Sequence, residues 1–319
     1  MLWNFHGLTI AGQTNNPALL ERWEASFASL PSAEASAPAL QFQLDLVSDI
    51  PPAPPGQPHF QQGEVLAYYL NGQTAIAHFP RFGQLTLDLA NGTTHGNIVS
   101  AALTTYGALE DLAAIGLSPH LRRRGLFLIH AFAAAITHDP LPEAVLIVGS
   151  IGAGKTTTGM SLLNAGWKLL SNDSPVLNAE GEVLQYPGLL AAYPKTFACF
   201  PATARWANTQ IQTTDGRKKL TVAAEDIWPE VWCERAPARA IVFPQIEDRA
   251  EHALEKLSQP EALRHLLPHA VEQWDTAMMP EHLRVLRLLV ERAPAYLLRL
   301  GPEVGAIPAL MERAITNYQ

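Results

Sequence analysis

Cysteine and charge are both scarce in this chain of 319 residues. Its two cysteines, Cys199 and Cys233, belong to no CxxC or mixed Cys/His pattern, which argues against a disulfide framework and against a zinc site. Charged residues make up only 16% of the chain and hydrophobic residues 48%, which is typical of a globular protein with a sizeable core. The sequence therefore predicts a folded protein that does not depend on crosslinks.

Long hydrophobic runs and an excess of positive charge are also missing. Residues 126–136 form the longest apolar run near the middle of the chain, but His130 interrupts it, and about 20 residues are needed to span a bilayer. The first residues, MLWNFHGLTIAGQTNN, lack the basic start and apolar run of a signal peptide. The net charge of −8 gives no broad attraction for a phosphate backbone. We expect a cytoplasmic protein that binds neither membranes nor nucleic acids.

The N-terminal part of the chain is rich in predicted strands. Short runs such as QFQLDLVS, EVLAYYLN and QLTLDLA alternate apolar and polar residues, and Asn71-Gly72 predicts a hairpin turn. Asn16 followed by Pro17 predicts the start of a helix. We expect a β-rich, mostly antiparallel N-terminal region over residues 1–110.

The pattern changes after Asn97, where apolar residues recur at helical spacing and Ser118-Pro119 predicts a new helix start. Residues 126–136, LFLIHAFAAAI, are ambiguous on their own. Alanine favours a helix, whereas the apolar run and the turn that follows favour a strand paired with EAVLIVG. Periodicity alone leaves both alternatives open.

A glycine-rich loop is the most informative motif. Residues 149–156, GSIGAGKT, match the pattern G-x-x-x-x-G-K-[ST] in full, between the buried-strand run VLIV and the helical segment TTTGMSLLNAG. Such a loop holds a phosphate chain by backbone N–H groups and by the positive end of the next helix, and glycines permit the close approach. In this pattern Lys155 reaches the terminal phosphates and the Thr156 hydroxyl binds the bridging Mg²⁺.

An acidic residue follows the next predicted strand. The run WKLLS ends in Asn172-Asp173, and ligands of open α/β sheets lie beyond the carboxyl ends of the strands, so we expect Asp173 to face the phosphates. A carboxylate there can hold Mg²⁺ or take a proton from an incoming hydroxyl. Alternatively, residues 172–175 form only a turn. The guanine-reading motif NKxD does not occur, which counts against a GTPase.

The segment from His130 through the glycine loop to Asp173 resembles the catalytic domain of HPr kinase/phosphorylase and of related kinases with the PEP carboxykinase-like fold. In that family a strand bearing a histidine precedes the glycine loop, and the helix leads to an acidic pair. The segments YPGLLAAYPKTFACFP, DGRKKLTV and APARAIVFPQIED are also similar, more loosely. The resemblance covers about residues 110–319, and it favours a strand for residues 126–131.

The resemblance implies an α/β fold in which residues 111–319 form a mixed-sheet P-loop kinase domain of the HPr kinase/PEP carboxykinase-like type. It implies an ATP- and Mg²⁺-dependent kinase acting on a hydroxyl, often of a serine, in a protein, peptide or small molecule, and it makes a homo-oligomer reasonable. The expected catalytic residues are Lys155, Asp173 and His130, and the expected metal ligands are Thr156 and Asp173. The residues expected to bind the nucleotide are Gly149, Ser150, Ile151, Gly152, Ala153, Gly154, Lys155, Thr156, Thr157, Arg217 and Lys218.

The chain departs from the family at Asn172, where an acid is expected. Asparagine cannot accept a proton at neutral pH, so the roles of two carboxylates fall on Asp173 alone. One possibility is that Asp173 holds Mg²⁺ and His130 takes the proton, although a histidine in an apolar run is also typical of a packed core. The alternative is a nucleotide-binding regulatory or scaffold protein with impaired phosphotransfer.

A basic run follows the predicted turn at Asp215-Gly216. Arg217, Lys218 and Lys219 are candidates to close over the nucleotide phosphates or to meet an anionic acceptor. A solvated basic turn would have the same composition.

Overall fold

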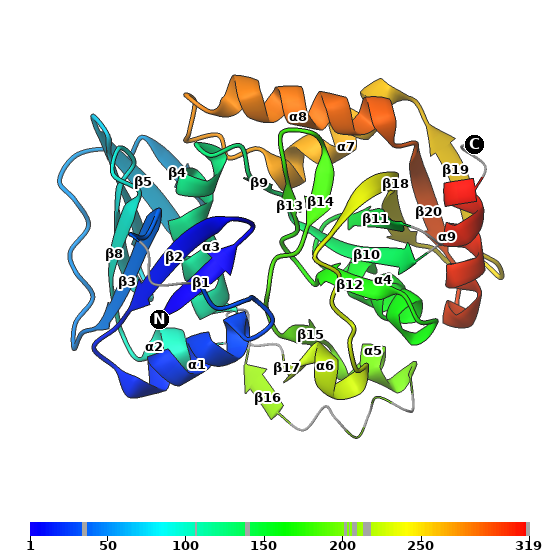
Figure 1. Ribbon diagram of the computed structural model, residues 1–319, viewed down its shortest axis with the longest axis horizontal. Helices are drawn as coiled ribbons and strands as arrows, with labels where there is room; N and C mark the ends of the chain where they lie inside the picture. The colour runs from blue at the N-terminus through cyan, green and yellow to red at the C-terminus, as the bar shows by residue number, and fades with distance from the viewer. Residues whose placement is uncertain are drawn as a thin grey trace. The chain divides into compact units, whose positions relative to one another are not determined.

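The computed structural model describes residues 1–33, 37–105, 107–137, 141–200, 203, 205, 209–212 and 218–316 (Figure 1). The chain forms two compact units: the first comprises Met1–Arg124, Ile211–Lys218 and Glu272–Thr276, and the second Gly125–Gln210, Lys219–Val271 and Ala277–Gln319. Along the chain the first unit runs past residue 110, where we expected the N-terminal region to end. Both units contain helices and mixed sheets, so the predicted mixed α/β class is confirmed.

The first unit contains an eight-stranded sheet with the order β1-β2-β3-β8-β7-β6-β5-β4. Its strands are β1 (Leu2–Phe5), β2 (Leu8–Gln13), β3 (Leu40–Leu46), β4 (Phe60–Gln62), β5 (Leu66–Asn71), β6 (Thr74–Phe79), β7 (Gly83–Asp88) and β8 (Thr93–Ile98). The mostly antiparallel sheet and the hairpin turn at Asn71-Gly72 are confirmed, and β3 is the exception because it pairs in parallel with β2 and β8. Helix α1 (Pro17–Phe27) makes the crossover that parallel pairing of β2 with β3 requires, and the Asn16 side chain caps it.

One helix of this unit differs from expectation. The new helix start predicted at Ser118-Pro119 is wrong, because α3 (Ala108–Arg122), which follows the short α2 (Ala101–Thr104), runs through both residues. Proline removes one helical hydrogen bond. The last turn is held instead by side chains: the Arg122 guanidinium, only 3% exposed, lies 2.8 Å from the Asp275 carboxylate.

The second unit is built on a nine-stranded sheet with the order β12-β10-β11-β18-β14-β13-β9, to which β20 is added beside β18 and β19 beside β20. Its strands are β9 (Phe127–Leu128), β10 (Ala131–Thr137), β11 (Pro142–Val148), β12 (Lys168–Ser171), β13 (Val176–Leu177), β14 (Glu182–Leu184), β18 (Arg235–Ile246), β19 (Ala253–Leu257) and β20 (Ala295–Leu300). The ambiguous residues 126–136 contain no helix: β9 and β10 flank a bend at His130, so the strand expected over residues 126–131 is interrupted there. Strand β10 pairs antiparallel with β11, as the strand alternative predicted.

Strand direction brings several strand ends to one edge of this sheet. Strand β18 runs parallel to β11 and to β20, and β10 runs antiparallel to both β11 and β12. It follows that β11, β12, β18 and β20 all end at the edge where β10 begins. The residue before β10 is His130, the residue after β11 is Gly149, and Asn172 follows β12.

Alternate residues of the central strands pack into two cores. Phe132 of β10 and Ile147 of β11 contact the core formed with α4 (Lys155–Asn164) and α9 (Ile307–Thr316). Ala133 and Leu146 contact the core formed with α7 (Gln259–Ala270) and α8 (Met279–Arg292) on the other face (Figure 1). A sheet buried on both faces explains the continuous apolar runs in the sequence.

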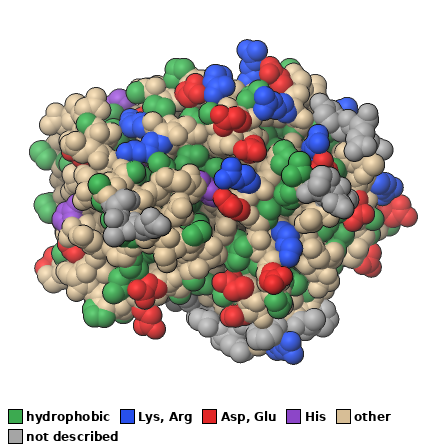
Figure 2. All heavy atoms as spheres, in the orientation of Figure 1, with side chains coloured by type: hydrophobic (Ala, Val, Ile, Leu, Met, Phe, Trp, Pro, Cys, Tyr) green, Lys and Arg blue, Asp and Glu red, His purple; other side chains and the backbone are tan. Residues whose placement is uncertain are grey.

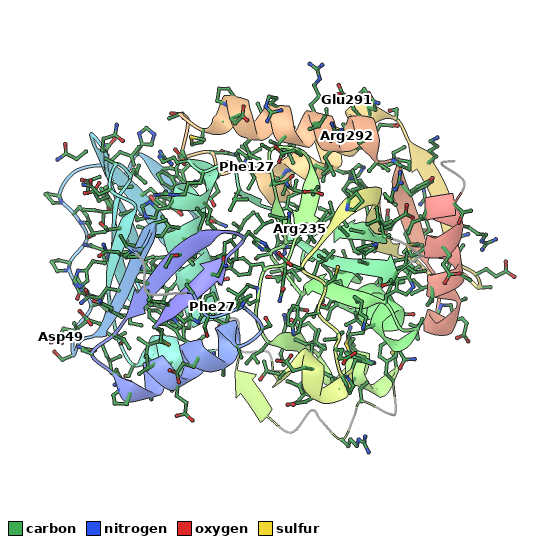
Figure 3. The ribbon with its side chains drawn as sticks, in the orientation of Figure 1. Phe27, Asp49, Phe127, Arg235, Glu291 and Arg292 are labelled. Atoms are coloured by element: carbon green, nitrogen blue, oxygen red, sulfur yellow. The ribbon has the colours of Figure 1, made fainter. Side chains whose placement is uncertain are left out.

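The remaining elements of the second half of the chain are short. They are β15 (Leu190–Ala192), α5 (Pro194–Ala198), β16 (Thr209–Gln212), β17 (Lys218–Val222), α6 (Ala224–Ile227) and the 3₁₀ turn η2 (Val304–Ala306). Strand β15 pairs antiparallel with β17. At the end of α8, Arg292 donates a hydrogen bond to the Glu180 carbonyl, while Phe127 is fully buried against His282 (Figure 3). Among the described residues, no helix is long and apolar enough to cross a membrane.

Packing between α4 and β10 yields a prediction for stability. A Cβ atom added at Gly159 would lie 2.3 to 2.5 Å from ring atoms of Phe132. We expect Gly159→Ala to lower the free energy of unfolding by about 1–3 kcal/mol, because overpacking outweighs the better helix propensity of alanine. Asn164→Ala, at an exposed position of the same helix, is the control and should change stability by about 0.5 kcal/mol or less. Chemical denaturation measures both; a stabilised Gly159→Ala would contradict the packing.

Candidate functional site

The glycine loop joins β11 to α4 and has the geometry that its sequence requires. Gly152 and Gly154 have φ angles of +84° and +107°, in the left-handed region that favours glycine. Space is short as well: a Cβ on Gly154 would lie 2.7 Å from Cδ1 of Leu300. Gly154, the residue directly before α4, is therefore a position that only glycine fills without strain.

Backbone N–H groups of the loop are left available. The Ala153 amide donates to the Ser150 carbonyl at 3.2 Å and closes a turn. Within the described parts of the chain, no acceptor is found for the amides of Ile151, Gly152, Gly154, Lys155 and Thr156. Orphan amides at a helix N-terminus, together with the helix dipole, favour an anion such as a phosphate.

Lys155 turns back over the loop. Its ammonium group, in a side chain that is 8% exposed, lies 2.6 Å from the Gly149 carbonyl, 3.3 Å from the Ser150 carbonyl and 3.0 Å from Nε2 of His130. An ammonium has three N–H donors and no acceptor, so these three contacts use all of them. A phosphate can bind Lys155 only if some of these contacts are given up.

Backbone hydrogen bonds place His130 in the site. The amides of Ile129 and Ala131 donate to the carbonyls of Pro175 and Asp173, at 3.1 and 3.0 Å, so this segment runs beside the end of β12. The His130 amide donates to the carbonyl of His269 at 2.7 Å, in the last turn of α7. His130 is thus held at the sheet edge rather than packed inside the core, and its side chain is 38% exposed.

His130 connects Lys155 to Asp173. Its Nδ1 lies 3.3 Å from Oδ1 of Asp173, on the opposite side of the ring from the Lys155 contact. Because the ammonium can only donate, Nε2 must be the acceptor, and the proton of a neutral imidazole is then on Nδ1, directed at the carboxylate. The three side chains form one chain of polar contacts from the loop to the end of β12.

The charges of the site shift two pKa values. Desolvation raises the pKa of Asp173, but the hydrogen bond and charge of His130, with the charges of Lys155 and Lys219, outweigh it, and the net pKa lies below the usual range. Burial lowers the pKa of Lys155; Lys219 lowers it further, and Asp173 opposes this. Asp173 is therefore an ionised carboxylate at neutral pH.

Lys219 is the basic residue that acts on this site. Its ammonium lies 5.3 Å from the centroid of the Tyr193 ring, in cation–π contact, and its charge affects both Lys155 and Asp173. Of the predicted nucleotide-binding residues, Arg217 lies outside the described residues, as does the side chain of Lys218. The basic run at residues 217–219 indicated a positive charge near the site, but the sequence did not show which of the three residues supplies it.

The remaining predicted residues lie in the loop and in the first turn of α4. Gly149 directly follows β11, Ile151 is exposed, and Thr157 shares a 3.2 Å contact between hydroxyls with Thr196 of α5. The functional sequence motifs did not point to His269, whose imidazole centroid lies 6.2 Å from that of His130. Burial and the charges of His130, Lys155 and His265 lower its pKa. Its position beside His130 could be known only from the fold.

The donor atoms near the loop are suitable for Mg²⁺ bound together with phosphates. Among the described residues, no group of three or more His, Cys, Asp or Glu side chains could hold a metal ion by itself. Mg²⁺ usually takes one or two carboxylates, a hydroxyl and oxygens of the substrate. Asp173 offers such a carboxylate, Thr156 a hydroxyl, and Oδ1 of Asn172 is a buried oxygen without a hydrogen-bond partner in the described structure. This oxygen-only donor set fits the expected ion.

Charged side chains of both signs are mixed on the surface. On the described atoms of the face in Figure 2, Lys and Arg side chains are interspersed with Asp and Glu. Mixed charges of this kind give no extended attraction for a polyanion.

The similarity of this chain to known proteins is limited. No family model matches the chain, and no curated protein matches it. Among solved structures, the HPr(Ser) kinase/phosphatase from Coxiella burnetii is similar at 14% sequence identity and a TM-score of 0.30, with 60% of this chain and 89% of that chain covered. This similarity is distant, so the relation to HPr kinases inferred from the sequence stays a prediction.

The electrostatic role of Lys219 can be measured. Lys219→Met removes a positive charge that lowers the pKa of both Lys155 and Asp173, so we expect both pKa values to rise. Carbon-13 NMR titration of the lysine Cε and aspartate Cγ signals reports the two groups separately. Lys168→Met, which removes a lysine bound 2.7 Å from the Glu230 carbonyl, is the control and should move neither. Unchanged values in Lys219→Met would place Lys219 outside the site.

Proposed function

We propose that this protein is a kinase that transfers the terminal phosphate of ATP to a hydroxyl group, with Mg²⁺ as cofactor. The observation that supports this most directly is the continuous set of contacts from Lys155 through His130 to Asp173, next to a glycine loop whose amides have no acceptor among the described residues. The loop offers donors for phosphates, and the dyad of His130 and Asp173 offers a base for a hydroxyl.

Phosphate binding and base activation are linked through Lys155. Its three N–H groups are used within the protein, and a terminal phosphate would draw the ammonium away from His130. Nε2 of His130 would then be exposed as an unprotonated acceptor, while Nδ1–H remains oriented by Asp173. The imidazole of His130 would thus become available as a general base only when the nucleotide is bound, which limits side reactions in the absence of the nucleotide.

The proposed step balances as a phosphoryl transfer. The acceptor oxygen forms a bond to the terminal phosphorus, the bond from that phosphorus to the bridging oxygen breaks, and ADP leaves. The hydroxyl proton passes to Nε2 of His130, and Asp173 stabilises the imidazolium that results. Lys155 and Lys219 offset negative charge on the phosphates and on the leaving oxygen.

Bound Mg²⁺ would neutralise phosphate charge, with Asp173 and Thr156 as its protein ligands and the Asn172 amide oxygen as a further donor. The carboxylate has two oxygens, so a contact of Oδ1 with His130 leaves Oδ2 for the metal. The proposed acceptor is a serine of a protein or peptide, or a hydroxyl of a small molecule, as the sequence resemblance implies. A homo-oligomer is part of the same proposal.

Asp173→Asn tests the proposed chemistry. The substitution removes the charge that would stabilise the imidazolium and hold Mg²⁺, so we expect ADP production in the presence of acceptor to fall by at least about a hundredfold. Nucleotide binding should persist because the loop is untouched, and thermal-shift titration with ATP, ADP, GTP and pyrophosphate, each with and without Mg²⁺, measures it. At a hundred times its dissociation constant, a ligand stabilises the fold by roughly 2.7 kcal/mol.

Two results would count against the kinase. Wild-type turnover by Asp173→Asn would remove Asp173 from the mechanism. Failure of every nucleotide and of pyrophosphate to stabilise the wild-type protein would remove the phosphate site itself.

A nucleotide-binding regulatory or scaffold role is the second candidate. Its support is Asn172, whose Oδ1 is buried without a hydrogen-bond partner among the described residues, at the position where the resembled family has an acid. If the missing acid has impaired transfer, Asn172→Asp should produce a transfer activity that the parent lacks, measured as ADP released in the presence of an acceptor library. Asn172→Gln, which adds no charge, serves as the control; no gain in Asn172→Asp would contradict this role.

A further inference from the structure

The surroundings of the glycine loop differ in polarity from one side to the other. On one side lie the charged and polar groups of Lys155, His130 and Asp173. On the other side lies Ile246, the last residue of β18, which is 62% exposed. An exposed aliphatic side chain next to the loop offers an apolar group of a ligand a surface to contact.

Ile246 is in direct reach of the loop. Its Cγ1 and Cδ1 lie 3.6 and 3.9 Å from the position that a Cβ on Gly154 would occupy, in ordinary van der Waals range. Leu300, at the end of β20, lies beside it against the same glycine. Ile246 is therefore a neighbour of Gly154, the residue directly before α4.

Several contacts fix the backbone at the end of β18, where Ile246 lies. Ile246 pairs with Leu300 in the parallel register of β18 and β20, and the Glu247 amide donates to the Leu300 carbonyl at 3.2 Å. The Glu247 carboxylate is bound by Arg299 and lies 3.6 Å from Arg249. Ile246 is thus presented by a strand end that is fixed before any ligand binds, which lowers the entropy cost of binding.

We propose that Ile246 is the platform for the base of the nucleotide. This inference rests on the proposed function, since it assigns the second half of the same ligand. A nucleotide has an anionic end and a flat, largely apolar end, and the site has a polar side and an exposed aliphatic side in the same order. The aliphatic side chain covers one face of the base and removes apolar surface of both groups from water. Phosphate contacts then hold the ligand, and Ile246 distinguishes a nucleotide from inorganic polyphosphate.

The test compares ATP with inorganic tripolyphosphate, which has the phosphates but no base. Isothermal titration calorimetry in Mg²⁺ buffer measures both dissociation constants for the full chain. We expect the wild-type protein to bind ATP more tightly than tripolyphosphate. Ile246→Ser should weaken ATP binding by about tenfold and leave tripolyphosphate within about twofold, because only the base loses its contact. Serine adds no charge that would repel phosphates.

Two further variants control for general effects. Ile246→Leu keeps an aliphatic surface and should retain most of the ATP affinity. Val65→Ser removes a side chain with a similar exposure, 61%, from the first unit and should change neither constant.

Each of the other outcomes contradicts the proposal that Ile246 contacts the base. Equal weakening of ATP and tripolyphosphate would mean that Ile246 only supports the loop. Unchanged binding of both, with a raised KM for the acceptor or a changed oligomeric state, would assign Ile246 to the acceptor or to a second copy of the chain. If wild-type protein binds tripolyphosphate but Ile246→Ser retains full ATP affinity, the platform fails and the phosphate site stands. If the wild type binds neither ligand, both proposals fail together.

Discussion

The contact between the Lys155 ammonium and Nε2 of His130 is the interaction on which the site depends. It uses the third donor of the ammonium, it determines which imidazole nitrogen carries the proton, and it thereby directs Nδ1–H at Asp173. In the proposed mechanism, the same contact keeps the lysine away from the phosphate until the nucleotide binds. In that mechanism, binding of a phosphate breaks this hydrogen bond and thereby exposes Nε2 of His130. A substitution at Lys155 would then affect the base, and one at His130 would affect phosphate binding.

Sheet topology makes this contact possible. Because β10 is antiparallel to both of its neighbours, the residue that precedes it lies beside residues that follow β11 and β12. His130, Gly149 and Asp173 are far apart in the sequence, and one sheet edge gathers them. The residues 129–131 are then fixed against the end of β12 and the end of α7 by backbone hydrogen bonds, which do not depend on side-chain identity. Backbone hydrogen bonds therefore hold the residues of the candidate site in place.

Local patterns predicted much of the framework. The glycine loop, the helix after it, the strand that ends before Asn172 and the hairpin at Asn71-Gly72 all follow from short-range rules of spacing and turn chemistry, and the structure has each of them. The helix start expected at Ser118-Pro119 failed because burial of Arg122 against Asp275, distant in sequence, outweighs the local effect of proline. Within residues 126–136, β10 could not be assigned by periodicity, since a strand buried on both faces has no polar side.

The sequence by itself determined the glycine loop and the helix after it, since glycines, a lysine and a helix N-terminus lie within a few residues of one another. It also identified Asp173 and His130 as candidates and located a basic run. Only the tertiary structure decided that His130 lies between Lys155 and Asp173, that Lys219 acts on both charged groups, and that Ile246 is exposed beside Gly154. The physical reason is that these relations depend on strand order and direction, which long-range packing sets and which no local pattern contains.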